Sequence, residues 1–159
     1  MTLSADQAYS KLAERCATSE LCTGEALEKL RLWGIPSDAA IKIVQRLVNE
    51  RFIDDERFAG IWVRDRLYNA RWGVLKIRNS LRMKRIDSDI IETALAENID
   101  SERYCANLLA ALRARARSLP SPLTYEAKMK LARFAINRGY EPSLVQEFIQ
   151  DESWRENND

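Results

Sequence analysis

The chain has 159 residues, enough for one compact domain or a short array of repeats, and 46% of them are hydrophobic. Its 25 basic and 24 acidic residues leave a net charge of only +1, so an electrostatic function requires local segregation of charge. The chain has no histidine, three widely spaced cysteines and five isolated glycines, which argues against catalytic triads, disulfide frameworks, zinc sites and phosphate-binding loops. We therefore expect a binding protein and no enzyme, with no metal and no cofactor.

No apolar run approaches the roughly 18 to 20 residues of a membrane span, and the N-terminus lacks a basic region followed by an apolar one. We expect a cytoplasmic protein with reduced cysteines and no membrane partner. The abundance of Ala, Leu, Arg and Glu, with few glycines and prolines, favours helices throughout.

The first 53 residues predict three helices. The segment Ser4–Gln7 has the pattern of a capping box and begins a helix that runs to about residue 17. A second helix covers Glu25–Trp33, and Gly34 ends it in a position where a left-handed conformation costs glycine little. A third helix begins after Pro36 and reaches about residue 50. Its predicted apolar stripe contains Ile41, Val44, Leu47 and Val48.

The pattern then restarts twice. Asp54 is the predicted N-cap of the next long helix, and Ile53 before it can pack on Phe58 as a hydrophobic staple. Ile99 and Asp100 repeat this arrangement ahead of Tyr104. We predict helices over 55–70, 74–84, 88–96, 101–117, 125–138 and 142–149, with a repeat period of about 50 residues.

These observations predict an all-α fold, a tandem array of three three-helix repeats in an elongated, curved, right-handed or solenoid-like stack. The expected units are residues 1–53, 54–99 and 100–150. The polar tail, residues 151–159, is expected to fray.

Positive charge is concentrated in the middle of the chain. Between Arg57 and Arg85 nine basic residues accompany a single acid, Asp65, and the third unit has a similar excess. The spacing of Arg57, Arg64 and Arg71 predicts one basic stripe, and a second on the next helix contains Arg78, Arg82 and Arg85. A run of charge can also be an ordinary solvated helix face, and Trp72 can be either a plug between helices or an exposed aromatic anchor. The candidate contacts with a partner or with DNA are Arg57, Arg64, Arg71, Trp72, Lys76, Arg78, Arg82, Lys84, Arg85, Lys128, Lys130, Arg133 and Arg138.

The run Ile53-Asp54-Asp55-Glu56-Arg57-Phe58-Ala59, followed by Trp72-Gly73, Lys76-Ile77-Arg78, Leu81 and Lys84, resembles the central signature of the RecX family. Lys128 to Phe134, Arg138-Gly139-Tyr140 and Val145 are similar to the third unit of that family. The chain departs from the family pattern at Ala70, Val74, Lys76 and Arg85, where the family has Gly, Pro, Arg and Gly.

The resemblance implies a monomeric regulator that binds the RecA nucleoprotein filament and inhibits its ATPase, strand-exchange and co-protease activities. It also implies a role in DNA repair by homologous recombination and in the SOS response. Contact with single- or double-stranded DNA would be weak in the absence of the filament. The alternative is a helical protein that binds nucleic acid without sequence preference and without a recombinase partner.

Overall fold

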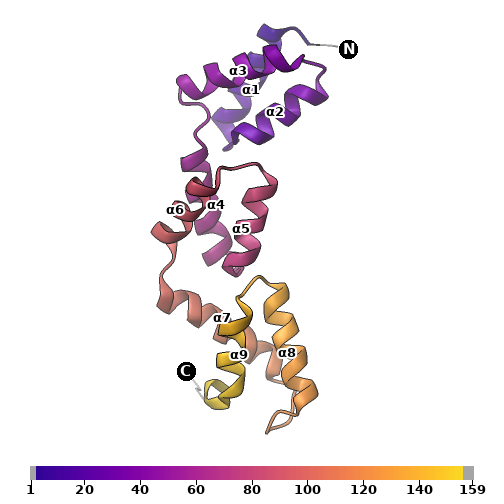
Figure 1. Cartoon of the computed structure of the whole chain (residues 1–159), viewed down its shortest axis with the longest axis vertical. Coiled ribbons are helices and arrows are strands. Elements are labelled where there is room, and N and C mark those ends of the chain that lie inside the picture. Colours follow the sequence, from indigo (N-terminus) through magenta and orange to yellow (C-terminus); the bar gives the residue numbers. More distant parts are fainter. Residues whose placement is uncertain (1–2, 156–159) are drawn as a thin grey trace. The chain divides into compact units, whose positions relative to one another are not determined.

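A computed structural model describes residues 3–155, and all regular secondary structure in this part of the chain is helical (Figure 1). Within these residues there is no β-strand, and none of the helices is long and apolar enough to cross a membrane. The helices are α1 (Ala5–Thr18), α2 (Thr23–Leu32), α3 (Ser37–Asn49), α4 (Asp55–Tyr68), α5 (Val74–Met83), α6 (Ser88–Asn98), α7 (Ser101–Ala116), α8 (Tyr125–Asn137), α9 (Pro142–Gln150) and the short 3-10 helix η1 (Glu152–Arg155). The all-helical prediction is confirmed.

Helices α1, α4 and α7 begin where the sequence predicts caps. In α1 the Gln7 N–H donates to Ser4 Oγ at 3.2 Å, and the Gln7 side chain accepts from the Ser4 N–H at 2.9 Å. Asp54 Oδ1 accepts a hydrogen bond from the Arg57 N–H at 3.0 Å, and Asp100 Oδ1 accepts one from the Glu102 N–H at 3.1 Å. Each oxygen satisfies a backbone donor that has no partner within its helix, which fixes the first turn.

Helices α2, α5 and α8 end in the same kind of turn. In each turn the second residue after the helix has a positive φ. The angle is 78° at Gly34, 61° at Arg85 and 99° at Gly139. The next N–H bonds to a carbonyl five residues back, at 3.0 to 3.2 Å, as in a Schellman motif. The next side chain is buried in every case, and these side chains are Ile35, Ile86 and Tyr140. The turn thus reverses the chain while anchoring an apolar residue.

The chain divides into two compact units. One contains the chain through Trp62 together with Ser80–Ala94, and its core includes Leu12, Leu30, Leu47 and Ile53. The other contains Val63–Asn79 together with the chain from Leu95 onward, and its fully buried side chains include Leu108, Leu112, Leu131 and Tyr140. The division into repeats at 1–53, 54–99 and 100–150 stays a prediction.

Two sequence expectations are wrong in detail. On α3 the side chains of Ile41 and Val48 are 49% and 43% exposed, whereas Ile43 is buried together with Val44 and Leu47. This helix carries more apolar residues than one face holds, and packing against α1 and α2 decides which of them are covered.

The tail does not fray over residues 151–155. Trp154 is only 4% exposed in η1, and its ring N–H donates to the Phe148 carbonyl at 2.7 Å. Arg113 donates to the Trp154 carbonyl, and Arg155 donates to the carbonyls of Ala116 and Leu119. Burial of the large Trp154 ring, with its N–H hydrogen-bonded, therefore holds this segment against the protein although its neighbours in the sequence are polar. Residues 156–159 of the predicted tail lie outside the described residues.

Candidate interaction surface

The two predicted arginine stripes are shorter than expected. Helix α4 ends at Tyr68, and Arg71 follows it with a φ of 58°. Helix α5 ends at Met83, and Arg85 has a φ of 61°. Neither arginine continues the helical row on which it was placed, because the chain has already turned out of the helix.

Two of the predicted contact residues are engaged within the first compact unit. Arg57 Nε lies 2.8 Å from a carboxylate oxygen of Glu20, and its guanidinium also donates to a backbone carbonyl at 3.3 Å. Lys84 Nζ lies 2.9 Å from a Glu25 oxygen and 4.7 Å from the centre of the Trp62 ring. Both cations join segments far apart in the sequence, so we assign them structural roles.

Lys84 belongs to a close backbone approach that we call the first glycine contact, formed by Cys22, Gly24 and Glu25 with Lys84 and Arg85. A Cβ atom at Gly24 would lie 2.2 Å from the Lys84 carbonyl oxygen, so only glycine fits. The Cys22 thiol lies 3.9 Å from the same oxygen, and burial raises the pKa of this thiol to about 12. This buried thiol is therefore unreactive at neutral pH.

A groove of about 540 Å³ lies beside this contact. Glu25 and Glu28 line it together with Lys29, Lys84 and Arg85. Its charges are nearly balanced, which weakens the case for an anion-binding surface here.

The second glycine contact joins Gly73 and Leu75, at the start of α5, to Arg138, Gly139 and Tyr140, at the end of α8. The Gly73 N–H donates to the Arg138 carbonyl at 2.8 Å, and the Leu75 N–H donates to the Gly139 carbonyl at 3.0 Å. A Cβ at Gly73 would lie 2.1 Å from the Gly139 carbonyl carbon, so the two backbones touch. The approach is possible only because both positions lack a side chain.

Side chains reinforce this contact around the turn after α4. An Arg138 guanidinium nitrogen donates to the Ala70 carbonyl at 3.2 Å, and the Tyr140 hydroxyl donates to the Arg71 carbonyl at 3.0 Å. The turn after α4, whose sequence departs from the family pattern, is thus held by residues more than 60 positions away.

Tyr104 supports the same region. Its hydroxyl donates to the Glu141 carboxylate and accepts from the Val74 N–H at 3.0 Å, and burial raises the pKa of this phenol. The sequence indicates Tyr104 only as an apolar staple residue, because a hydroxyl on an aromatic position gives no sign of its distant partners.

Trp72 is half-buried. Lys76 Nζ lies 4.2 Å from the centre of its ring, and the Arg66 guanidinium carbon lies 5.2 Å from it. The ring is therefore packed in the turn and covered by cations, and its role as a partner contact stays a prediction.

The remaining candidates on α4, α5 and α8 differ in exposure and in their partners. Arg64 is exposed and donates to Asn98 Oδ1 at 3.0 Å. Lys76 and Arg82 are exposed on α5, and Arg78 is half-buried. Lys128, on α8, lies 3.9 Å from a Glu152 oxygen and is thereby partly neutralised.

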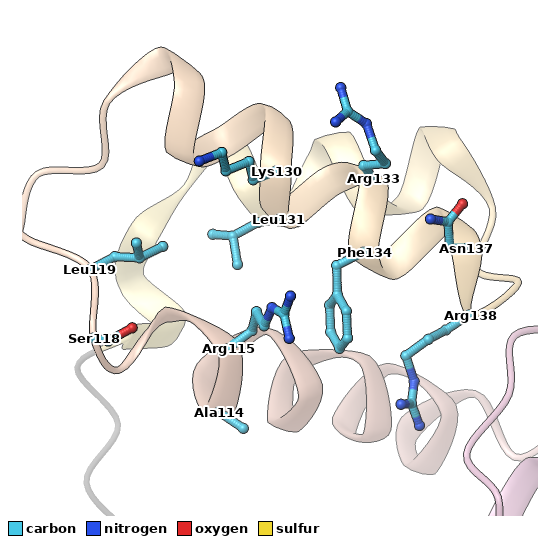
Figure 2. Close-up of a pocket in the computed structure, with 10 residues that line it drawn as sticks. All are labelled: Ala114, Arg115, Ser118, Leu119, Lys130, Leu131, Arg133, Phe134, Asn137 and Arg138. Atoms are coloured by element: carbon cyan, nitrogen blue, oxygen red, sulfur yellow. The ribbon is translucent and has the colours of Figure 1, made fainter.

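A basic recess of about 780 Å³ lies between α7 and α8 (Figure 2). Its lining residues are Ala114, Arg115, Ser118, Leu119, Lys130, Leu131, Arg133, Phe134, Asn137 and Arg138. We call this recess the basic groove. It unites three predicted contact residues, Lys130, Arg133 and Arg138, with Arg115, which the sequence did not single out because nothing local indicates that α7 faces α8 at this point.

Figure 2 shows Phe134 extending from α8 toward α7, with Arg115 and Arg138 on either side of it. The guanidinium carbons lie 4.9 and 5.7 Å from the centre of the ring. Arg133 extends away from the ring toward solvent. No acidic side chain lines the basic groove among the residues that the structure describes, so its four cations present uncompensated positive charge.

The fold defines a class of protein, one built from tandem three-helix domains. The family models described as "RecX, second three-helix domain" and "RecX, third three-helix domain" match residues 54–95 and 102–149. The chain belongs to the RecX family, a family of regulatory proteins.

Similar proteins agree with this assignment. "Regulatory protein RecX" of Mycolicibacterium vanbaalenii is 34% identical over 148 residues, which cover 89% of this chain and 80% of the relative. The protein of the same description from Clostridium botulinum is 30% identical over 125 residues, covering 78% of this chain and 58% of the relative. The crystal structure of RecX from Lactobacillus salivarius shares the fold, with a TM-score of 0.80 at 22% identity over 92% of this chain and 94% of that one.

Proposed function

We propose that this chain binds a RecA nucleoprotein filament and lowers its ATPase, strand-exchange and co-protease activities. Membership of a family of regulatory proteins supports this proposal, as does the resemblance of the Asp54 to Lys84 segment to the family signature. The observation that carries it is the basic groove, because four cations without a lining acid are suited to an acidic protein surface or to the phosphates of bound DNA.

The direct test is to add the protein to RecA assembled on single-stranded DNA and to follow ATP hydrolysis. We expect turnover to fall as the protein approaches the RecA concentration, and the fall should weaken with added salt because exposed charges are screened beyond about 8 Å at physiological ionic strength. Unchanged turnover at several-fold excess protein would contradict the proposal.

Charge reversal in the basic groove gives a sharper version of this test. The double variant Lys130→Glu/Arg133→Glu should need about tenfold more protein for half-inhibition, because two attractive charges become repulsive. Both side chains are exposed, so the change in folding free energy should stay within about 0.5 kcal/mol each. The matched control is Arg31→Glu/Lys42→Glu, which makes the same change of charge at exposed positions of α2 and α3. Equal loss of inhibition in both variants would show that net charge, not the groove, matters.

The second candidate function is nucleic-acid binding without a recombinase partner, which the excess of cations on α5 and α8 favours. Labelled single-stranded DNA titrated at two salt concentrations separates the two. Tight binding to bare DNA that falls steeply with salt, together with unchanged RecA turnover, would favour this candidate.

A further inference from the structure

Helix α8 presents large apolar side chains to solvent on the face that its core residues leave free. Tyr125, Met129 and Ile136 are 77%, 45% and 38% exposed. At 3.6 residues per turn these three side chains lie within about 40° of one another around the helix axis. We call them the apolar stripe. Solvation of this row costs free energy that burial against a partner would recover.

The apolar stripe runs beside the basic groove. Arg133 lies roughly 40° further around the helix than Met129, and Lys130 follows it on the same side. Both cations line the basic groove, where Arg115 joins them from α7. One helix therefore offers an apolar row and a cationic edge side by side, with its core residues Ala127, Leu131 and Ala135 on another side.

The chemistry of this face suits a protein better than a nucleic acid. Met129 and Ile136 cannot stack on bases, and the Phe134 ring already has guanidinium groups on either side. Tyrosine, methionine and arginine are enriched at protein interfaces, and this face combines all three.

We propose that the apolar stripe and the cationic edge of the basic groove form one docking surface for a protein segment that carries apolar and carboxylate side chains. The occupant is an acidic, amphipathic segment on the surface of RecA, chosen by charge complementarity with Arg115, Lys130 and Arg133. The inference rests on the proposed function and deepens it: apolar contacts supply affinity, while the cations set orientation and association rate.

The test uses the full chain and its variant Met129→Ser/Ile136→Ser. Affinity is measured twice, once for RecA assembled on single-stranded DNA and once for the same DNA without RecA. We expect the variant to bind RecA filaments at least tenfold more weakly than the unaltered chain, and to bind bare DNA within twofold of it. Circular dichroism should be unchanged, and any shift in melting should match that of the control variant on α3, because the side chains are exposed to a similar extent in both.

The matched control is Ile41→Ser/Val48→Ser on α3, where two apolar residues with the same spacing are 49% and 43% exposed. It should retain the affinity of the unaltered chain for RecA. Equal weakening in the control overturns the inference, as does an unchanged affinity of the α8 variant when the unaltered chain binds. A parallel loss of affinity for bare DNA would mean that the surface contacts nucleic acid, which also overturns it. If the unaltered chain fails to bind RecA at all, the proposed function and this inference fall together.

Discussion

The two glycine contacts solve one packing problem with different interactions. In each, a glycine near the start of one helix lies against the left-handed turn that ends another: Gly24 against Lys84, and Gly73 against Gly139. The first contact relies on side chains, through the Glu25–Lys84 ion pair at 2.9 Å. The second relies on the backbone, through two N–H donors at 2.8 and 3.0 Å.

The residue in the turn explains this difference. Gly139 has no side chain, so the backbone of the α5 start can approach closely enough to bond to its carbonyl. Arg85 occupies the equivalent turn in the first contact, with its Cβ 3.3 Å from the position that a Gly24 Cβ would take. Where the turn carries a side chain, at Arg85, an ion pair holds the contact. Where the turn is a glycine, at Gly139, backbone hydrogen bonds hold it.

Gly73→Ala should have the largest effect. Its Cβ would lie 2.1 Å from both the Gly139 carbonyl carbon and the Tyr140 nitrogen, and hydrogen bonds hold this backbone in place. We expect a loss of about 3 kcal/mol in the free energy of unfolding, measured by urea denaturation. Gly24→Ala should cost less stability. Its new Cβ would meet one carbonyl oxygen, that of Lys84, at 2.2 Å, and within the described part of the chain no backbone hydrogen bonds hold the two segments of the first contact together.

The exposed substitution Gln146→Ala in α9 serves as the control and should change stability by less than about 0.5 kcal/mol. A Gly73→Ala variant as stable as this control would show that the second contact can open without cost.

Glu25→Gln should have an intermediate effect that depends on pH. Burial raises the pKa of the Glu25 carboxyl, but the Lys84 ammonium and the Cys22 N–H favour the ionised form more strongly, so the net pKa lies below its usual 4.5. The contribution of ionised Glu25 to the free energy of unfolding is therefore fully present above the ordinary pKa of 4.5. It disappears as the pH falls through the lower pKa of the folded state.

We expect Glu25→Gln to cost about 1 kcal/mol at pH 7, with the difference from the unaltered chain closing as the solution is acidified. Thermal melting at a series of pH values measures it. A difference that stays constant down to pH 3 would mean that the ion pair does not stabilise the first contact.

Arg85→Gly should have the smallest effect, and it should stabilise. The left-handed conformation of Arg85 costs an L-residue roughly 1–2 kcal/mol, and glycine avoids most of this cost. Part of the gain is lost because glycine also gives the unfolded chain more conformational freedom. We expect a net gain of about 0.5 kcal/mol, or a melting temperature higher by about 1–2 °C. Arg82→Gly, inside α5, is the matched control and should lower the melting temperature instead. A lower melting temperature for Arg85→Gly would show that its side chain is needed in the turn.

Much of the secondary structure follows from local signals in the sequence. The capping box at Ser4 and the caps at Asp54 and Asp100 place three helix starts, because each acts within one turn of the chain. Gly34 marks the end of α2 for a similarly local reason. The end of α5 has no such marker, since an arginine occupies the left-handed position, and the predicted helix therefore ran one residue too long.

The candidate site follows from the sequence only in part. Lys130 and Arg133 share one face of α8, which their spacing indicates, and the structure places both in the basic groove. Charge and helical spacing also predict Arg57 and Lys84 as contact residues, yet each pairs with a carboxylate from a distant segment. Charge counting cannot separate neutralised cations from available ones, because their partners lie 37 and 59 residues away.

The sequence by itself determined the all-helical architecture, the family and the excess of positive charge in the middle and C-terminal parts of the chain, because these depend on local patterns. Tertiary structure decided which cations remain available, that Arg115 joins α8 across a groove, and that Gly73 must be a glycine. It also buried Trp154 in a segment that reads as polar. These outcomes depend on which surfaces meet, and packing between segments distant in sequence is what brings those surfaces together.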